Sequence, residues 1–252
     1  MNIGGITVEI TMTPEQLDEL LKSAEEGFAR AQFNLAVCYH NGAGMEKDLD
    51  EALKWYTKSA NQGNLNACYT LANMYYLGQD VEQDWEKAFQ NFKVAAEKGH
   101  TRARHFLAEC YTFGQGVEQN FEEAAKWYEL AAIKGHLESQ VNYGICLSEG
   151  LGVEQNDQEA LKWYQLAAEK DHPAAQFNVG VCYLQGEGVE KDEAMAAQWL
   201  QKSADQDFAD AHYLLGLCYE DGVGVEQDRE KAKAYWQKAA DLGLEEAQEK
   251  LQ

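Results

Sequence analysis

A period of 36 residues runs through almost the whole chain, and it constrains the fold more than any other feature of the sequence. The phrase GLGVEQNDQEALKWYQLAAEKD at residues 150–171 returns as GVGVEQDREKAKAYWQKAADLG at residues 222–243. Looser copies start at Gly42, Gly114 and Gly186. A unit of this kind cannot bury its apolar face alone and has to stack on its neighbours, so the period predicts a repeat architecture.

Each unit has the pattern of two helices joined by a glycine turn. Residues 31–39 place apolar side chains at helical spacing, and the glycines that follow supply positive φ. An Asp or Asn then stands where a second helix needs its N-cap. Alanines eight residues apart, such as Ala52 and Ala60, let helices approach closely, while Trp55 and Tyr56 fill the space between neighbouring pairs. The sequence therefore predicts an all-α solenoid of antiparallel helix pairs.

The repeated pattern A-x-x-x-L-(A/G)-x-x-Y-x-x-G-x-G-V-x-x-D-x-x-x-A-x-x-W-Y-x-x-A-A-x-x-G resembles the Sel-one-like repeat, a relative of the tetratricopeptide repeat. The resemblance covers residues 14–252. It implies a right-handed superhelical solenoid of helix pairs that acts as an adaptor for protein–protein interactions. It does not indicate which partner is bound.

The period also predicts the domain organisation. We expect an N-terminal arm at residues 1–13, in which ITVEI has the alternation of an extended segment, and one solenoid domain at residues 14–252. Partial capping helices are expected at residues 14–27 and 244–252. The six full repeats are predicted at 28–63, 64–99, 100–135, 136–171, 172–207 and 208–243.

Charge narrows the range of partners. The net charge is −22 and the acidic residues are spread along the chain, so the surface repels phosphate backbones and nucleic-acid binding is not expected. A protein or peptide partner with basic residues is expected instead. The first residues lack the pattern of a secretory signal, and no apolar run is long enough to cross a membrane. We expect a cytoplasmic monomer without membrane contact, although export that needs no signal stays open.

Cysteines and histidines follow the repeat, which favours packing over chemistry. Five of the six cysteines share one register, and Cys68 lies outside it, so five buried small hydrophobes and one more exposed thiol are predicted. His100, His136 and His172 start successive units and are expected to be surface turn residues far from any second metal ligand. No metal, no cofactor and no nucleophile–base pair is predicted, which indicates a protein that is not an enzyme.

Binding residues are expected on the first helix of each unit, which lines the concave face of tetratricopeptide repeats. Positions that differ between copies are free to carry specificity, and their spacing of three and four keeps each set on one helix face. For the apolar members, packing against the adjacent unit is an equal alternative. The second unit departs most from the pattern around Tyr76 and Trp85, which indicates either a contact site or sequence drift. The candidate partner-binding residues are Phe33, His40, Tyr69, Asn73, Tyr76, His105, Glu109, Phe113, Glu149, Phe177, Tyr213 and Glu220.

Three functions fit these patterns. The leading hypothesis is an adaptor that binds a protein or peptide, through basic residues, in a concave groove. The second is an immunity or regulatory protein that masks a basic toxin or enzyme. The third is a hydrolase acting on cell-wall or β-lactam substrates, which would need a nucleophile and a base within hydrogen-bond distance.

Overall fold

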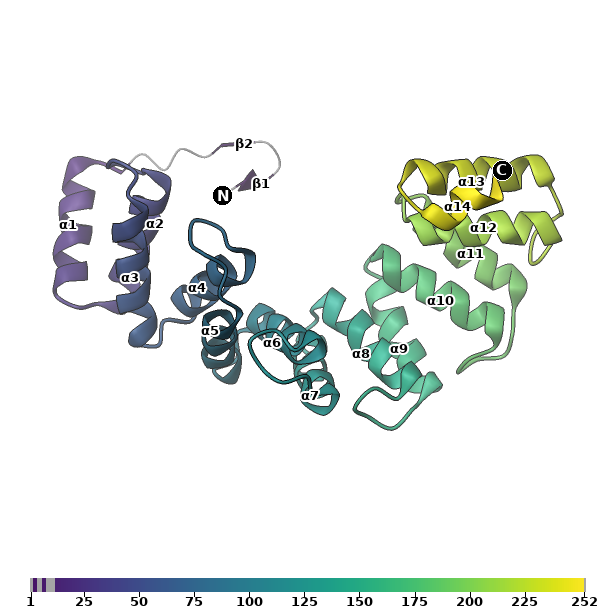
Figure 1. Cartoon of the computed structure of the whole chain (residues 1–252), viewed down its shortest axis with the longest axis horizontal. Helices are drawn as coiled ribbons and strands as arrows, with labels where there is room; N and C mark the ends of the chain where they lie inside the picture. Colours follow the sequence, from purple (N-terminus) through teal and green to yellow (C-terminus); the bar gives the residue numbers. More distant parts are fainter. Residues whose placement is uncertain (1, 4–5, 8–11, 252) are drawn as a thin grey trace. The chain divides into compact units, whose positions relative to one another are not determined.

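The structure is a computed structural model, and it describes residues 2–3, 6–7 and 12–251. Its helices form two compact units, Met1–Asn120 and Phe121–Gln252. Figure 1 labels the helices and strands of both. The extended segment predicted at residues 6–10 is described only at Ile6–Thr7, and residues 8–10 lie outside the described part.

The described part of the first unit contains six helices and two short strands. Its elements are β1 Asn2–Ile3, β2 Ile6–Thr7, α1 Pro14–Glu25, α2 Ala29–Asn41, α3 Leu49–Asn61, α4 Leu65–Leu77, α5 Trp85–Glu97 and α6 Thr101–Phe113. The two strands are antiparallel, with Asn2 paired to Thr7 and Ile3 to Ile6. Each helix from α1 to α5 packs on the one that follows it in the chain.

The second unit continues the alternation of first and second helices. Its elements are α7 Phe121–Ala132, α8 Leu137–Glu149, α9 Asp157–Ala168, α10 Pro173–Gln185, α11 Glu193–Ala204, α12 Ala209–Asp221, α13 Arg229–Asp241 and α14 Glu245–Lys250. Here too, each helix packs on its successor in the chain. The all-α fold of repeating helix pairs is therefore confirmed.

Local chemistry explains where the helices begin and end. All six first helices, α2 to α12 in even numbers, end at a left-handed glycine whose N–H closes the last turn onto a cysteine or methionine carbonyl. Five of the second helices are preceded by an N-cap residue. Its side chain accepts hydrogen bonds from N–H groups of the first turn, which otherwise lack partners. These N-caps are Asp48, Asp84, Asn156, Asp192 and Asp228.

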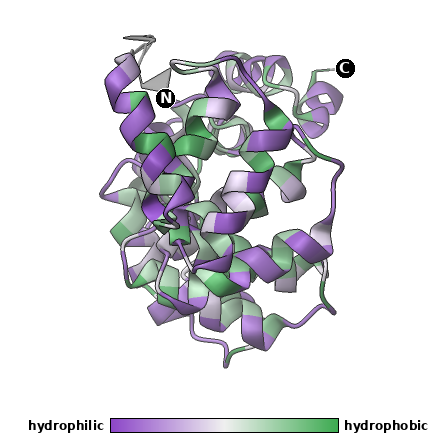
Figure 2. Ribbon diagram, turned by 90° about the vertical axis from the view of Figure 1, so that its left-hand side faces the viewer, coloured by the Kyte–Doolittle hydropathy of each residue, from purple (hydrophilic) through white to green (hydrophobic). Residues whose placement is uncertain are grey.

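Most helices carry both hydrophobic and hydrophilic residues (Figure 2). In the core, small residues on one helix face large residues on the next. The first repeated alanine of each second helix, as in Ala52, has at most 1% exposure. Gly144 lies under the Tyr164 ring and Gly216 under the Trp236 ring, so close that a methyl group would overlap either ring. Of the two adjacent aromatic positions, the second is the more buried in every repeat, whereas Trp127, Trp163 and Trp199 are only half-buried.

The second turn glycine brings successive repeats together. Gly116 packs its backbone on the carbonyl of Trp85, and Gly188 does the same on Asp157. Both have positive φ, so a side chain would be strained and would also collide with backbone. Asp80 occupies this register in the second repeat with φ 63°, and its carboxylate reaches His40 at 3.3 Å (Oδ2 to Nε2). None of the described helices is long and apolar enough to span a membrane.

Candidate protein-interaction site

The predicted aromatic residues of the second repeat form a cluster with the third repeat. Tyr69 and Tyr76 on α4 both contact Phe92 on α5 and Phe106 on α6, with ring centroids 5.7–6.2 Å apart. Phe92 and Phe106 stack at 5.2 Å, and His100 stacks on Tyr69 at 4.5 Å. Burial raises the pKa of Tyr76 to about 12, so its phenol stays neutral. The two tyrosines thus hold neighbouring repeats together and expose only part of each ring.

Phe33 and His40, the candidates of the first repeat, have similar surroundings. Both rings on α2 face Tyr56, at 5.7 and 6.0 Å between centroids. His40 also meets the Asp80 carboxylate of the next repeat. Both side chains are half-buried.

The third repeat has the most accessible of the apolar candidates. Phe113, the last residue of α6, is 64% exposed. Glu109 lies one turn earlier on the same helix face, 3.4 Å from the buried His105 ring (Oε1 to Nε2). Asn73 is half-buried on α4. An exposed ring beside a carboxylate can receive an apolar side chain together with a cation.

In the second unit the candidate residues each have different contacts. Glu149 is exposed at the end of α8. Phe177 packs on Phe208 at 5.5 Å between ring centroids, and the Tyr213 carbonyl accepts a hydrogen bond from Trp236 Nε1. Glu220 pairs with Lys250 at 3.1 Å. Glu149 is thus the exposed member of this set, and the other three are half-buried.

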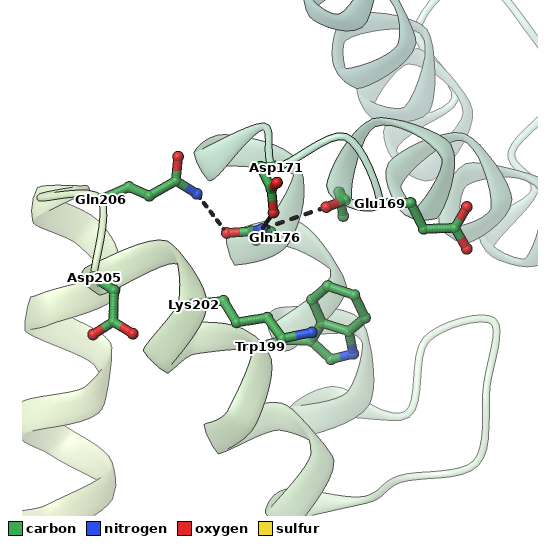
Figure 3. Close-up of a pocket in the computed structure, with 8 residues that line it drawn as sticks. Glu169, Asp171, Gln176, Trp199, Lys202, Asp205 and Gln206 are labelled. Carbon is green, nitrogen blue, oxygen red and sulfur yellow. Dashed lines mark hydrogen bonds between the residues drawn. The ribbon is translucent and has the colours of Figure 1, made fainter.

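A hollow of about 610 Å³ lies where α9 ends and α10 and α11 pack together (Figure 3). Lys202 extends over the Trp199 ring, with Nζ 3.9 Å from its centroid. Gln206 donates to Gln176 at 2.8 Å, and Gln176 in turn donates to the Ala168 carbonyl. Three repeats earlier, Asn61, Asn91 and Val94 help to line a matching hollow of about 380 Å³. The hollow is a product of repeat packing, and Lys202 already occupies the ring face that a ligand cation would use.

We did not predict from the sequence that one repeated position of the first helices, that of Gln32, supplies hydrogen-bond donors to the preceding helix. At this position the donors of the first five repeats reach back eight residues to a carbonyl in the last turn of the preceding helix. Cys68 is one of these donors, with its sulfur 3.7 Å from the Ala60 oxygen, and it is buried; the expectation of a more exposed thiol was wrong. The shared register could have revealed the pattern, because every member can donate a hydrogen bond. The residues at this position are Gln32, Cys68, Arg104, Gln140, Gln176 and His212.

The described cysteines and histidines are arranged as parts of the scaffold. All six thiols are free and buried, and burial raises the pKa of Cys110 to about 12, so the reactive thiolate is scarce at neutral pH. Within the described residues, no group of three or more metal-binding side chains comes together. His136 Nδ1 lies 3.0 Å from Ser139 Oγ and 3.5 Å from Glu138, but a hydrolytic triad uses different ring nitrogens for its two partners. Ser139 is also fully buried, so this geometry does not support a hydrolase.

The three histidines expected at surface turns are half-buried helix N-caps. Each Nδ1 accepts from the backbone N–H three residues later, at 3.1 Å for His100, 3.3 Å for His136 and 3.4 Å for His172. Asn64 has the same role at the same register in the second repeat. Burial lowers the pKa of His100, with a smaller effect from Arg102, and burial lowers the pKa of His172 against a small opposing effect of Glu138.

These caps predict a specific acid sensitivity. The pKa of each histidine in the folded protein lies below its ordinary value of 6.5. Between 6.5 and the folded pKa the unfolded chain therefore binds more protons than the folded one, so stability falls as the pH drops from 6.5 through the folded pKa. Protonation at Nδ1 removes the acceptor, and a lost N-cap costs about 1 kcal/mol. We expect His100→Asn with His172→Asn to keep both caps and to lose less stability than the wild type between neutral and mildly acidic pH. Urea unfolding at both pH values measures this, and an equal loss in both proteins would disprove the cap assignment.

The sequence matches the Sel1 repeat family six times, over residues 29–64, 65–100, 101–136, 137–172, 173–208 and 209–244. A comparison with curated proteins finds no match.

Solved structures show the same fold. A protective antigen of uropathogenic Escherichia coli strains, which displays an SLR fold, is 35% identical with a TM-score of 0.82; the match covers 93% of this chain and 50% of the antigen. This chain thus spans about half the length of that relative. A Sel1 repeat protein from Oxalobacter formigenes is 28% identical over 90% of this chain and 88% of its own, with a TM-score of 0.74.

A more distant similarity is to an immunity protein from Pseudomonas aeruginosa, 18% identical over 86% of this chain and 82% of its own, with a TM-score of 0.51. This similarity concerns the fold alone. Six consecutive matches and the observed helix pairs agree with the resemblance noted in the sequence: the chain belongs to the Sel1 repeat family.

Proposed function

We propose that this chain is a non-enzymatic scaffold that binds a protein or peptide partner through the exposed parts of its first helices. Sel1 repeat proteins generally mediate protein–protein interactions, and such scaffolds are typically not enzymes. The observation that carries the proposal is the position of Phe113 one turn after Glu109 on α6. An exposed ring and a carboxylate share one face of α6, at positions that differ from repeat to repeat.

The chemistry of the surface favours a partner with basic residues. The net charge of −22 raises the local concentration of cationic segments and speeds their encounter with the protein. In the second unit, Glu149 and Glu220 also place carboxylates on first helices. Apolar anchors would supply most of the affinity and carboxylates most of the selectivity.

The test starts with affinity purification and mass spectrometry to identify the partner, followed by binding measurements over a range of salt concentrations. We expect charge reversal to Lys at Glu109, Glu149 and Glu220 together to weaken binding at least about tenfold, mainly through slower association. Weaker salt dependence should accompany the loss.

The matched control reverses three exposed glutamates away from the first-helix candidates, and it changes the net charge by the same amount. It should bind within about twofold of the wild type, because charge outside the contact area acts only at long range. If both triple variants lose affinity equally, overall charge rather than a site attracts the partner. If neither loses affinity, the acidic first-helix surface does not bind the partner. The control residues are Glu97, Glu169 and Glu249.

A further inference from the structure

Three large apolar side chains are exposed at one end of the second and third repeats, and we call them the loop-edge patch: Leu77, Trp85 and Phe113. Leu77 is 63% exposed, Trp85 44% and Phe113 64%. Leu77 is the last residue of α4, Phe113 is the last residue of α6, and Trp85 is the first residue of α5.

Packing within the first unit places the three residues at the same end of neighbouring helices. Leu77 and Phe113 are 36 residues apart and hold equivalent positions. Tyr76, next to Leu77, contacts Phe106 of α6 at 5.7 Å between ring centroids, so α4 and α6 lie side by side. The turn after Phe113 packs through Gly116 on the backbone of Trp85.

The apolar character belongs to these two repeats and not to the scaffold. At the position of Leu77 and Phe113 the other repeats have polar residues: Asn41, Glu149, Gln185 and Asp221. A helix can therefore end here with a polar side chain, and packing does not require Leu or Phe. Exposed apolar residues that the fold does not need mark a surface that is covered by something else.

Carboxylates border the patch. Glu82 and Glu118 are exposed on the turns that follow α4 and α6, and in the part of the chain that the structure describes neither forms an ion pair. The neighbouring Gln83 donates to the Tyr76 carbonyl at 2.8 Å, and Gln119 donates to the Thr112 carbonyl at 2.7 Å. Each turn is thereby tied to the last turn of its helix through the residue that follows its glutamate.

We propose that the loop-edge patch docks a basic amphipathic segment of a partner protein. Its apolar side chains cover Leu77, Trp85 and Phe113, and its Lys or Arg side chains meet Glu82 and Glu118. The unpaired carboxylates select this occupant over an acidic or purely apolar one, because like charges repel and unmatched charges would be desolvated. This inference rests on the proposed function and assigns part of the binding to the turns at the ends of the first helices.

The probe is a synthetic peptide of about four helical turns, with Leu on one face and Lys on the other. A scrambled peptide of the same composition and a peptide with Glu in place of Lys are its controls. Fluorescence anisotropy of labelled peptide gives the Kd for the full chain. Leu methyl NMR signals, with Leu77 identified through its substitution, show where the peptide binds.

We expect Leu77→Asn with Phe113→Asn to weaken peptide binding about tenfold or more. Asn is the residue that the first repeat has at this position, Asn41, and both sites are exposed, so the fold should persist; circular dichroism checks it. Glu82→Gln with Glu118→Gln should weaken binding about threefold or more and reduce its salt dependence.

The matched control is Glu154→Gln with Glu190→Gln, the same change on equivalent turns that follow polar helix ends. It should leave the Kd within about twofold of the wild type. The inference fails if the wild type does not bind the peptide, if the Leu77 and Phe113 variant binds equally well, or if the control loses as much affinity as the Glu82 and Glu118 variant. A natural partner that still binds through Glu109, Glu149 and Glu220 would leave the proposed function standing in each of these cases.

Discussion

Phe92→Ala should lower the free energy of unfolding by about 3–5 kcal/mol, because it empties a fully enclosed site. Phe92 has no exposed surface and stacks on Phe106 with an interplanar angle of 9°. It also contacts Tyr69 and Tyr76 within the second repeat, so its loss removes these contacts together with the Phe106 contact that joins the second repeat to the third. Repeat proteins depend on such nearest-neighbour contacts for cooperativity. Urea denaturation followed by circular dichroism measures the change.

Val94→Ala on the same helix is the matched control. Val94 is 39% exposed, so removing its methyl groups should change stability by no more than about 0.5 kcal/mol. A loss of similar size in both variants would show that α5 tolerates no change of side chain at all. A small loss in Phe92→Ala alone would show that the aromatic cluster is not the contact that joins the repeats.

Gly188→Ala should cost about 2–4 kcal/mol, the sum of left-handed strain and overlap with a neighbouring backbone. Gly188 has φ +70°, and a Cβ there would meet the carbonyl oxygen of Asp157 well inside van der Waals contact. Backbone atoms cannot rotate away as a side chain can, so α9 or the turn has to shift. Thermal and urea unfolding of the purified variant measure the loss.

Gly44→Ala separates the two contributions. Gly44 has nearly the same φ, +75°, but the nearest atom to its Cβ would be 3.6 Å away. Only the strain of the left-handed conformation remains, so a loss of about 1 kcal/mol is expected. Equal losses at Gly44 and Gly188 would show that the turn does not depend on close contact with the preceding repeat.

Much of the fold could be predicted because it depends on short, repeated patterns. The helix pairs, the Asp and Asn N-caps and the left-handed glycines follow from the chemistry of a few adjacent residues, and the structure has them where the pattern indicates. Trp55 and Tyr56 are both buried, as expected, but the burial of the tryptophan position varies between repeats. Its ring is half-buried in most repeats, and the neighbouring position supplies the core, because helix spacing alone does not show which of two adjacent residues faces inward.

For the candidate site, too, the sequence selected the positions but did not show which side chains are exposed. Sequence comparison between repeats selected Phe33, Tyr69 and Tyr76, but the structure places these rings against neighbouring helices. It also selected Phe113, which is exposed. The residue types are the same in both cases; the difference is whether a neighbouring helix supplies a partner.

The sequence by itself determined the repeat, the helix boundaries and the acidic surface of this protein, since each depends on composition or on interactions within a few residues. Only the tertiary structure decided that Cys68 is a buried donor, that Asp80 meets His40, and that Leu77 and Phe113 remain uncovered. Burial and pairing across a 36-residue period depend on how closely one repeat approaches the next. That distance results from the packing of neighbouring helices, so the sequence of one repeat does not determine it.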